Sequence, residues 1–417
     1  MSDLLSAVAR NWHPFVPIGV IGILSWSIWL VRKLLSNRYR SVVNDFRTTT
    51  SVVVPSYRED PDVLERCLDT WLAQRPTEVI VVLDVDDAEA RRRLEGRRDP
   101  RLSVIAFPHR GKRSALGVGI RAAAGEVLVL SDSDTAWLPG LLSSVQMPFA
   151  DPGVGAVGTR QNVYRPGRNV WRRIADWIID LRYLDYVPAT GRAGAVVCVS
   201  GRTAAYRRAA VLPVLEHLEH EFFLGRRCIA GDDGRLTWLV LASGYRTVHQ
   251  SSARALSMFP STFRAFCKQR VRWSRNSYRC YLTAAWNGWL WQVPLVSQVT
   301  VLQILFTPVT MFAAVYYVVV AGQGPGGGQG LVLAGAWLLV GRTIRSLSHL
   351  RRKPADVVLL PLVVLVIALV ALPIKTYAFV TMNRQGWLTR RPTLVGGEAQ
   401  DEASLAPAAV QGVAVTS

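Results

Sequence analysis

The stretch EVLVLSDSDT at residues 126–135 decides the fold class, because an apolar run leads directly into two carboxylates. Similar short apolar runs alternate with amphipathic helical patterns between residues 48 and 160. The expected strands are TTTSVVVPSY at 48–57, EVIVVLD at 78–84, RLSVIAFP at 101–108 and EVLVLSD at 126–132, and the expected helices are PDVLERCLDTWLAQ at 61–74 and KRSALGVGIRAAAG at 112–125. This alternation predicts an α/β fold with a mostly parallel sheet and helices on both faces.

Carboxylates follow two of these strands. Asp84 ends one strand, and Asp132 and Asp134 follow another. Ligands of such sheets bind beyond the carboxyl ends of the strands. Two carboxylates two residues apart at a strand end can point to one side, and hard oxygen ligands suit Mg²⁺ or Mn²⁺. Such a metal keeps its other positions for water and for the phosphates of a nucleotide diphosphate, so the pair predicts a metal site.

A second acidic motif, GDD at 231–233, precedes a helical apolar pattern. An aspartate in this position can cap the helix N-terminus. It can also act as a general base that takes the proton of an attacking hydroxyl group. Since capping needs only one acid, we assign Asp232 mainly to structure and Asp233 to the base.

The QRVRW motif at 269–273 lies in a basic amphipathic segment, residues 256–287. Gln269, Arg272 and Trp273 are spaced i, i+3 and i+4, so they share one face of a helix. The segment can lie on a membrane surface. The same helix can also place Arg272 against a diphosphate and Trp273 against an acceptor sugar.

Two further segments have polar groups at useful places. Lys112 and Arg113 open a helix, where free backbone N–H groups favour phosphate or an acidic sugar, although ordinary surface charge explains them equally well. Ser200 and Gly201 begin SGRTAAYRR, which can be a simple strand edge or a place where a sugar approaches the backbone closely.

Apolar blocks flank this polar middle. Residues 14–31 are long enough to cross the roughly 30 Å hydrocarbon core, and the basic residues after them place the following domain, 48–255, in the cytosol. Residues 291–345 predict a transmembrane hairpin. Residues 357–382 are interrupted by proline and lysine, which favours a re-entrant or interfacial element over a simple crossing. The short segment 1–13 precedes these blocks, and the tail at 393–417 is expected to be disordered.

Composition narrows the kinds of binding partner and of cysteine site that the chain can have. The 417 residues carry a formal charge of +19, for which the anionic inner leaflet of a bilayer is a better partner than nucleic acid. The five cysteines stand singly without a CxxC pair, so neither a zinc site nor a disulfide framework is indicated.

The order of PSYRED, VVLD, GKR, DSDT, SG…YR, GDD…LT, QRVRW and GWLTR resembles family 2 inverting glycosyltransferases. The resemblance is to the group of hyaluronan synthases, chitin synthases and nodulation chitooligosaccharide synthases, and covers residues 48 to 391. It implies a GT-A-like nucleotide-sugar-binding domain inserted between transmembrane helices, a uridine diphosphate (UDP) sugar donor, and a multi-pass protein of the cell membrane. The implied activity is processive transfer to a β-linked polysaccharide that is guided into the membrane.

The resemblance also implies roles for individual residues. Tyr57, Glu59 and Asp84 would hold uridine. Lys112 and Arg113 would help to bind the donor, and Asp132 and Asp134 its phosphates and metal. The acceptor and diphosphate would meet Ser200, Gly201, Gln269, Arg272 and Trp273, beside the base Asp233 and its neighbour Asp232. Residues 383–392 would form a gating segment near the nucleotide, with Trp387, Thr389 and Arg390.

The chain departs from hyaluronan synthases near the acceptor. Arg202 and Thr203 stand where those enzymes have Pro-Leu, Gly234 and Arg235 where they have Arg-His, and Leu388 where they have Gly. Fewer membrane spans are expected here, so a polymer channel would have to be completed by the chain's own few helices, a partner or another copy of the chain. Transfer of a single sugar to a lipid or other membrane acceptor is the alternative, and a non-catalytic membrane scaffold is a more remote one.

Overall fold

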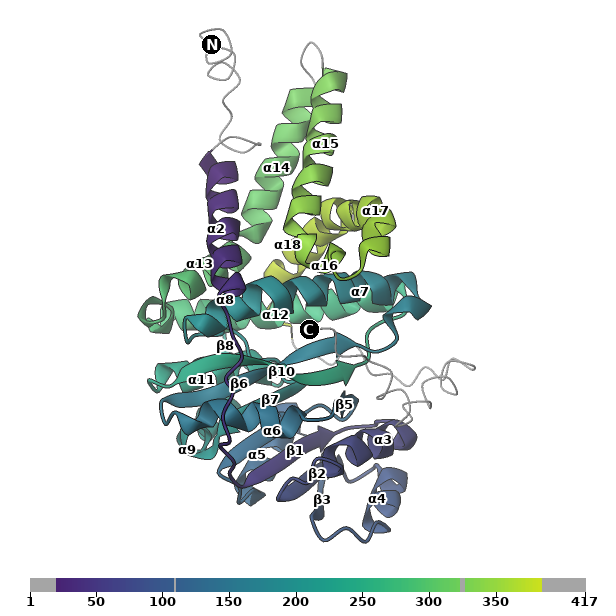
Figure 1. The fold of residues 1–417 in the computed structure, drawn as a ribbon, viewed down its shortest axis with the longest axis vertical. Coiled ribbons are helices and arrows are strands. Elements are labelled where there is room, and N and C mark those ends of the chain that lie inside the picture. Colours follow the sequence, from purple (N-terminus) through teal and green to yellow (C-terminus); the bar gives the residue numbers. More distant parts are fainter. Residues whose placement is uncertain (1–19, 109, 323–326, 385–417) are drawn as a thin grey trace.

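The computed structural model describes residues 20–108, 110–322 and 327–384. Its centre is an eight-stranded sheet in the order β3-β2-β1-β4-β7-β6-β10-β5, accompanied by a small β8-β9 pair (Figure 1). The strands are β1 (Thr50–Ser56), β2 (Glu78–Asp84), β3 (Leu102–Phe107), β4 (Val127–Ser131), β5 (Thr135–Trp137), β6 (Val154–Val163), β7 (Thr203–Arg207), β8 (Phe222–Phe223), β9 (Arg226–Arg227) and β10 (Arg246–Ser257).

The sheet is mixed, with a parallel half that matches the predicted strands. Strands β3, β2, β1 and β4 pair in parallel, as do β6 and β10. Strand β7 runs antiparallel to both of its neighbours, and β5 antiparallel to β10. Four of the seven strand pairings are parallel, as expected for a mostly parallel sheet. The three antiparallel pairings were not predicted, because apolar periodicity reveals a strand but not its direction. The SGRTAAYRR segment forms β7 in the interior of the sheet and is not a strand edge.

Alternating side chains of the central strands pack against helices on both faces. Val52 and Val54 of β1 join one core with Trp71, whereas Val53 joins the other core with Ile120. Successive side chains in a strand point to opposite faces, which explains why Val52, Val53 and Val54 are all apolar in a strand covered on both sides. The predicted two-sided layer is confirmed.

The helices fall into two groups. Those around the sheet are α3 (Pro61–Leu72), α4 (Ala88–Glu95), α5 (Lys112–Ala122), α6 (Leu141–Gln146), α7 (Val170–Leu181), η3 (Arg182–Tyr186), α8 (Val187–Arg192), α9 (Arg208–Val211), α10 (Leu215–Glu219), α11 (Asp232–Ala242) and α12 (Phe263–Trp286). The second group is α2 (Val20–Asn37), α13 (Leu295–Leu305), α14 (Thr307–Gly322), α15 (Gly327–Arg345), α16 (Leu347–Leu350), η6 (Pro354–Leu359), α17 (Leu360–Leu365), η7 (Val366–Ala371) and α18 (Leu372–Val380).

Helices α7 and α12 lie between the sheet and the second group (Figure 1). Within the described ranges, the continuous helical run Pro354–Val380 is long and apolar enough to cross a membrane. Leu295–Leu305 and Thr307–Tyr316 meet the same condition only when taken together, and they are bent by 55°. The number of crossings therefore stays a prediction. Part of the expected first span and the predicted gating residues Trp387, Thr389 and Arg390 lie outside the described residues.

Candidate active site

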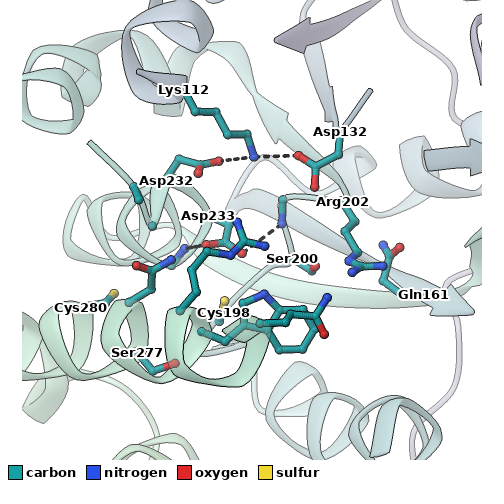
Figure 2. Close-up of a pocket in the computed structure, with 18 of the residues that line it drawn as sticks. Lys112, Asp132, Gln161, Cys198, Ser200, Arg202, Asp232, Asp233, Ser277 and Cys280 are labelled. Carbon is teal, nitrogen blue, oxygen red and sulfur yellow. Dashed lines mark hydrogen bonds and ion pairs between the residues drawn. The ribbon is translucent and has the colours of Figure 1, made fainter. Parts of the chain in front are cut away.

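A cavity of about 450 Å³ lies beyond the carboxyl end of β4. The turn after β4, the start of α5, the loop before β7, the start of α11 and one side of α12 form its walls (Figure 2). The predicted residues that line it are Lys112, Asp132, Asp134, Ser200, Gly201, Asp232, Asp233, Gln269, Arg272 and Trp273. Residues separated by up to 161 positions in the sequence thus meet in one place, as the order of motifs predicts.

Lys112 joins the two acidic motifs. Its Nζ lies 2.7 Å from Oδ1 of Asp132 and 3.0 Å from Oδ2 of Asp232. Burial lowers the pKa of Lys112, but the two carboxylates outweigh burial and the pKa is raised above its usual value. The ammonium group is therefore a fixed positive charge between the end of β4 and the start of α11.

The turn after β4 is held by a hydrogen bond to a residue that does not line the cavity. Oγ of Ser133 donates to Oε2 of Glu59 at 2.6 Å, while Asp132 and Asp134 on either side of it line the cavity. Glu59 was expected to hold uridine. In this structure its carboxylate contacts the acidic turn and it is not among the residues that line the cavity.

Asp233 is positioned by backbone N–H groups. Oδ2 accepts from the Gly201 N–H at 3.3 Å and Oδ1 from the Gly234 N–H at 2.8 Å. Burial and the neighbouring Asp232 raise the pKa of Asp233, and Lys112 lowers it less. The result is a carboxylate with increased affinity for a proton, which suits a general base.

The glycines beside Asp233 leave space for this arrangement. A Cβ on Gly201 would lie 3.1 Å from Cβ of Asp233. Gly231 precedes α11 with a φ of 78°, a left-handed conformation that few other residues adopt readily. Gly231 occupies the N-cap position, and Asp232 pairs with Lys112, so the predicted capping role of Asp232 is not what the structure contains.

One side of α12 forms a continuous wall of the cavity. The lining residues follow helical spacing from Ala265 to Tyr281 and include Gln269, Arg272, Trp273, Asn276, Ser277 and Cys280. At a rise of 1.5 Å per residue this stripe is roughly 24 Å long. The predicted shared face of Gln269, Arg272 and Trp273 is confirmed.

Several polar atoms on this wall are not satisfied by the described residues. Gln269 is 6% exposed, and its Oε1 lacks a hydrogen-bond partner there, as does Nε of Arg272. Buried polar groups nearly always have partners, so these atoms point to a ligand or ordered water. The ring of Trp273 has the guanidinium groups of Arg270 and Arg202 at 4.9 and 5.7 Å from its centroid.

A narrow recess adjoins the main cavity. Tyr57 and Asp84 line it, and it shares Pro55, Gly111 and Lys112 with the cavity. Oδ1 of Asp84 accepts from the backbone N–H of Asp86 at 3.0 Å, which fixes the end of β2. The structure thus places two of the expected uridine contacts next to the charged cavity but not inside it.

Arg113 does not reach the cavity. It is 4% exposed and donates to Glu221 at 2.6 Å and to the carbonyl oxygens of Ala230 and Gly231 at 3.0 and 3.2 Å. Neighbouring positions on a helix point about 100° apart, so Lys112 and Arg113 serve different sides. Arg113 holds the loop that leads to Asp232 and Asp233, a correction to the expected donor contact.

Sequence reasoning missed other lining residues. Arg182 and Tyr183 come from η3, and Arg202 precedes β7. Extending the helical face of QRVRW by one and two turns would have found Asn276 and Cys280. Arg202 lies inside the SGRTAAYRR motif but was assigned no role, and Arg182 and Tyr183 belong to no motif used in the sequence analysis.

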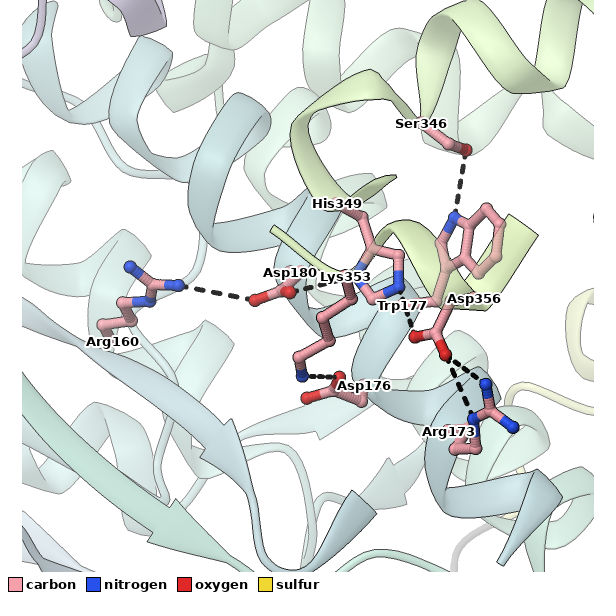
Figure 3. A network of polar contacts seen from close by, with 9 residues as sticks. All are labelled: Arg160, Arg173, Asp176, Trp177, Asp180, Ser346, His349, Lys353 and Asp356. Carbon is pink, nitrogen blue, oxygen red and sulfur yellow. Dashed lines mark hydrogen bonds and ion pairs between the residues drawn. The ribbon is translucent and has the colours of Figure 1, made fainter. Parts of the chain in front are cut away.

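A second buried group of charges lies outside the cavity, between α7 and the segment 346–356 (Figure 3). The possible metal ligands Asp176, His349 and Asp356 bring their ligand atoms within 4.8 Å of one another. Lys353 already pairs with Asp176 and Arg173 with Asp356. A metal ion would have to compete with both cations, so Asp132 and Asp134 remain the better candidates for the metal of a reaction.

Comparison with known proteins identifies the family of this chain. Residues 47–276, more than half of the chain, match the family described as glycosyltransferase like family 2. An N-acetylglucosaminyltransferase of Bradyrhizobium diazoefficiens is 29% identical over 362 residues, which cover 82% of this chain and 71% of that protein. An N-acetylglucosaminyltransferase of Sinorhizobium fredii is 32% identical over 243 residues, which cover 57% of this chain and 59% of that protein.

The fold has a counterpart among solved structures. A mannosyltransferase from Pyrobaculum calidifontis, solved with GDP-Man and Mn²⁺, aligns with a TM-score of 0.57 and 22% identity. The alignment covers 83% of this chain and 96% of the mannosyltransferase. It supports the GT-A-like fold alone. Taken with the match over residues 47–276, the cavity and its motifs show that the chain belongs to the family 2 glycosyltransferases.

Proposed function

We propose that this chain transfers a sugar from a UDP-sugar donor to the growing end of a β-linked polysaccharide, with inversion, and guides the product into a membrane. The observation that carries the proposal is one cavity holding Asp233, the Lys112 bridge and the α12 wall. N-Acetylglucosamine is the first sugar to test, because the relatives from Bradyrhizobium and Sinorhizobium are named for its transfer.

The donor would span the recess and the cavity. Its uridine would lie beside Tyr57 and Asp84, and its diphosphate would enter the cavity through the shared wall at Lys112. Of the cations that line the cavity, Lys112 and Arg272 would contact the phosphates. A bidentate guanidinium matches phosphate oxygens well, which suits Arg272 to the leaving group.

Asp132 and Asp134 fit a divalent cation. Both carboxylates line the cavity, and oxygen ligands are the kind that Mg²⁺ and Mn²⁺ prefer. The bound metal would supply neutralisation of the leaving diphosphate. Lys112 now contacts Asp132, so we expect its ammonium group to adjust when a metal and donor enter.

Asp233 would accept the proton of the acceptor hydroxyl as that oxygen attacks the anomeric carbon. The N–H groups of Gly201 and Gly234 fix the orientation of its carboxylate. Attack by an external oxygen with departure of the diphosphate from the opposite side gives inversion. The raised pKa of Asp233 increases its strength as a base in this step.

The α12 wall favours an extended acceptor. It lines the cavity for roughly 24 Å, longer than one sugar ring, and presents Trp273, Asn276 and Tyr281. Its other contacts lead to the second helix group, since Arg275 donates to Oγ1 of Thr381 at 2.8 Å and Arg279 to the Met382 carbonyl. The chain that enters the proposed gating segment, 383–392, is thereby held against α12.

The test is to incubate the purified chain in nanodiscs with Mn²⁺ and radiolabelled UDP-sugars, singly and in pairs, and to size the products. A ladder from UDP-N-acetylglucosamine is expected. A ladder that forms only when two donors are supplied would identify the chain as a copolymer synthase. A product extended by one sugar would support the alternative, transfer to a lipid or membrane acceptor. Consumption of no donor would contradict the proposal.

A further inference from the structure

The contact between α2, η3 and α15 contains two layers of charged side chains with different pairing. In the first layer, Nζ of Lys33 lies 2.7 Å from Oδ1 of Asp185, and Oγ of Ser348 donates to the same oxygen at 2.7 Å. This layer is electrically neutral and hydrogen-bonded. It needs nothing from outside.

The second layer contains three arginines near Tyr186, namely Arg32, Arg342 and Arg345. The guanidinium group of Arg32 lies 5.1 Å from the centroid of the Tyr186 ring. Tyr186 is close enough to interact electrostatically with Arg32, Arg342 and Arg345, and it also forms a hydrogen bond with Arg32. Among the described residues, no carboxylate acts on any of the three. Like charges are therefore gathered without a counterion.

The hydrogen bonding of this layer is also incomplete. Arg32 is 4% exposed, and its Nε and Nη2 lack partners within the described ranges, as does Nε of Arg342. Arg345 donates to Oγ of Ser25 at 2.9 Å. An unpaired buried guanidinium is costly, and an anion from outside the chain would remove that cost.

The surroundings identify the kind of anion. Trp26 and Trp337 contact each other beside the arginines, and Arg345 lies 4.6 Å from the Trp26 ring centroid. Exposed apolar side chains of α2 and α15, such as Leu30 and Leu338, flank the site. Tryptophan next to arginine at the end of apolar helices is typical of the headgroup level of a bilayer.

We propose that Arg32, Arg342 and Arg345 form a binding site for the phosphate of an anionic phospholipid. The site rests on the membrane association in the proposed function, because the apolar flanks must be in lipid. Arg32 comes from the flank of the first predicted span, and Arg342 and Arg345 from the end of the predicted hairpin. These distant segments meet at one predicted cytosolic boundary, where anionic lipid is concentrated.

The test is native mass spectrometry of the full-length protein in detergent, titrated with phosphatidylglycerol, phosphatidylcholine or inorganic phosphate. Wild type is expected to retain phosphatidylglycerol in preference to the other two. The variant Arg32→Gln/Arg342→Gln/Arg345→Gln is expected to bind it about a hundredfold more weakly. Equal retention of phosphatidylglycerol by this variant and wild type would overturn the proposal.

Matched controls separate the site from general charge attraction. Arg38→Gln/Arg40→Gln/Arg351→Gln removes the same charge from exposed positions and is expected to retain the lipid as wild type does. If it loses the lipid to the same extent, the site is refuted. Should the first triple variant fail to fold, Arg342→Gln alone is expected to weaken binding by about fivefold, and no change would count against the site.

Two further arms identify the ligand and separate this proposal from the proposed function. If the protein retains inorganic phosphate as well as it retains phosphatidylglycerol, the ligand is a soluble anion and the lipid proposal is overturned. Donor consumption is measured on the same samples. Loss of lipid selectivity with sugar transfer intact refutes only the lipid site, and lipid selectivity without transfer refutes only the proposed function.

Discussion

Helix α7 borders two groups of charged residues, those of the cavity and those of the buried network around His349. The two groups contain similar side chains but differ in how completely these are paired. Ile179 of this helix lines the cavity, whereas Asp176 and Asp180 join the buried network with His349 (Figure 3). In the network, Nδ1 of His349 lies 3.0 Å from Asp180 and Nε2 lies 2.9 Å from Asp356. Lys353, Arg160 and Arg173 each pair with one of its carboxylates.

The cavity leaves its groups less completely paired. Asp233 is held by backbone N–H groups with a raised pKa, and Gln269 and Arg272 have atoms without partners among the described residues. The network, by contrast, satisfies its carboxylates with cations and a histidine that is 0% exposed. Charged residues alone therefore do not identify a functional site here. What distinguishes the cavity is that it contains hydrogen-bonding atoms that the described residues leave without partners.

The largest expected effect separates chemistry from stability. Asp233→Asn should lower turnover by roughly 10²–10⁴, because the amide cannot accept the acceptor proton. Loss of the charge should not lower stability, since the raised pKa means that the fold disfavours the charged form of Asp233. Any fall should be limited to the one backbone N–H, of Gly201 or Gly234, that the amide NH2 group cannot accept. Turnover is measured at saturating donor and the unfolding midpoint by circular dichroism. Asp69→Asn, at a side chain that is 54% exposed, is the matched control, and near-normal turnover of folded Asp233→Asn would remove Asp233 as the base.

The network should show the reverse pattern. His349→Phe keeps a ring against Trp177, whose centroid lies 4.7 Å from that of His349, but leaves oxygens of Asp180 and Asp356 without their partner. The expected loss is about 3–5 kcal/mol of unfolding free energy, with turnover of the folded protein close to wild type. His217→Phe changes an exposed histidine and is the control. A selective loss of turnover with unchanged stability would mean that the network takes part in the reaction.

The contrast also explains what the sequence could predict. Lys112, Asp132 and Asp233 lie in short motifs at strand ends and helix starts, where local pattern and three-dimensional position are closely linked. The network joins Asp180 to His349 across 169 residues, with no motif at either end. Only packing of α7 against the segment 346–356 brings them together, and periodicity does not encode such packing.

Errors at the site have equally local causes. Arg113 was grouped with Lys112 because they are adjacent, although adjacent residues on a helix face different directions. The direction of β7 could not be deduced either, because an apolar strand pattern is the same in parallel and antiparallel pairing. The interior position of β7 is nevertheless what carries Gly201 to within contact of Asp233.

A smaller effect tests the electrostatic link inside the cavity. Asp233 must be unprotonated to act as a base, so kcat/KM should fall as the pH is lowered through its raised pKa. Lys112 lowers that pKa, so Lys112→Gln should move the acidic limb of the pH profile to higher pH, besides weakening donor binding. Lys268→Gln, at an exposed position of α12, should leave the limb in place. An unmoved limb in Lys112→Gln would show that another group controls it.

The smallest effect is expected where a charged pair is in water. Arg91 and Glu95 are 2.7 Å apart on α4, with side chains 48% and 49% exposed. Arg91→Gln should cost only about 0.3–0.5 kcal/mol, because solvent screens the pair and both side chains lose entropy in forming it. Thermal unfolding of Arg91→Gln, His349→Phe and wild type under the same conditions measures the two losses of stability. A loss as large as that of His349→Phe would mean that burial is not what gives the network its strength, whereas the expected small loss leaves the exclusion of water as the cause.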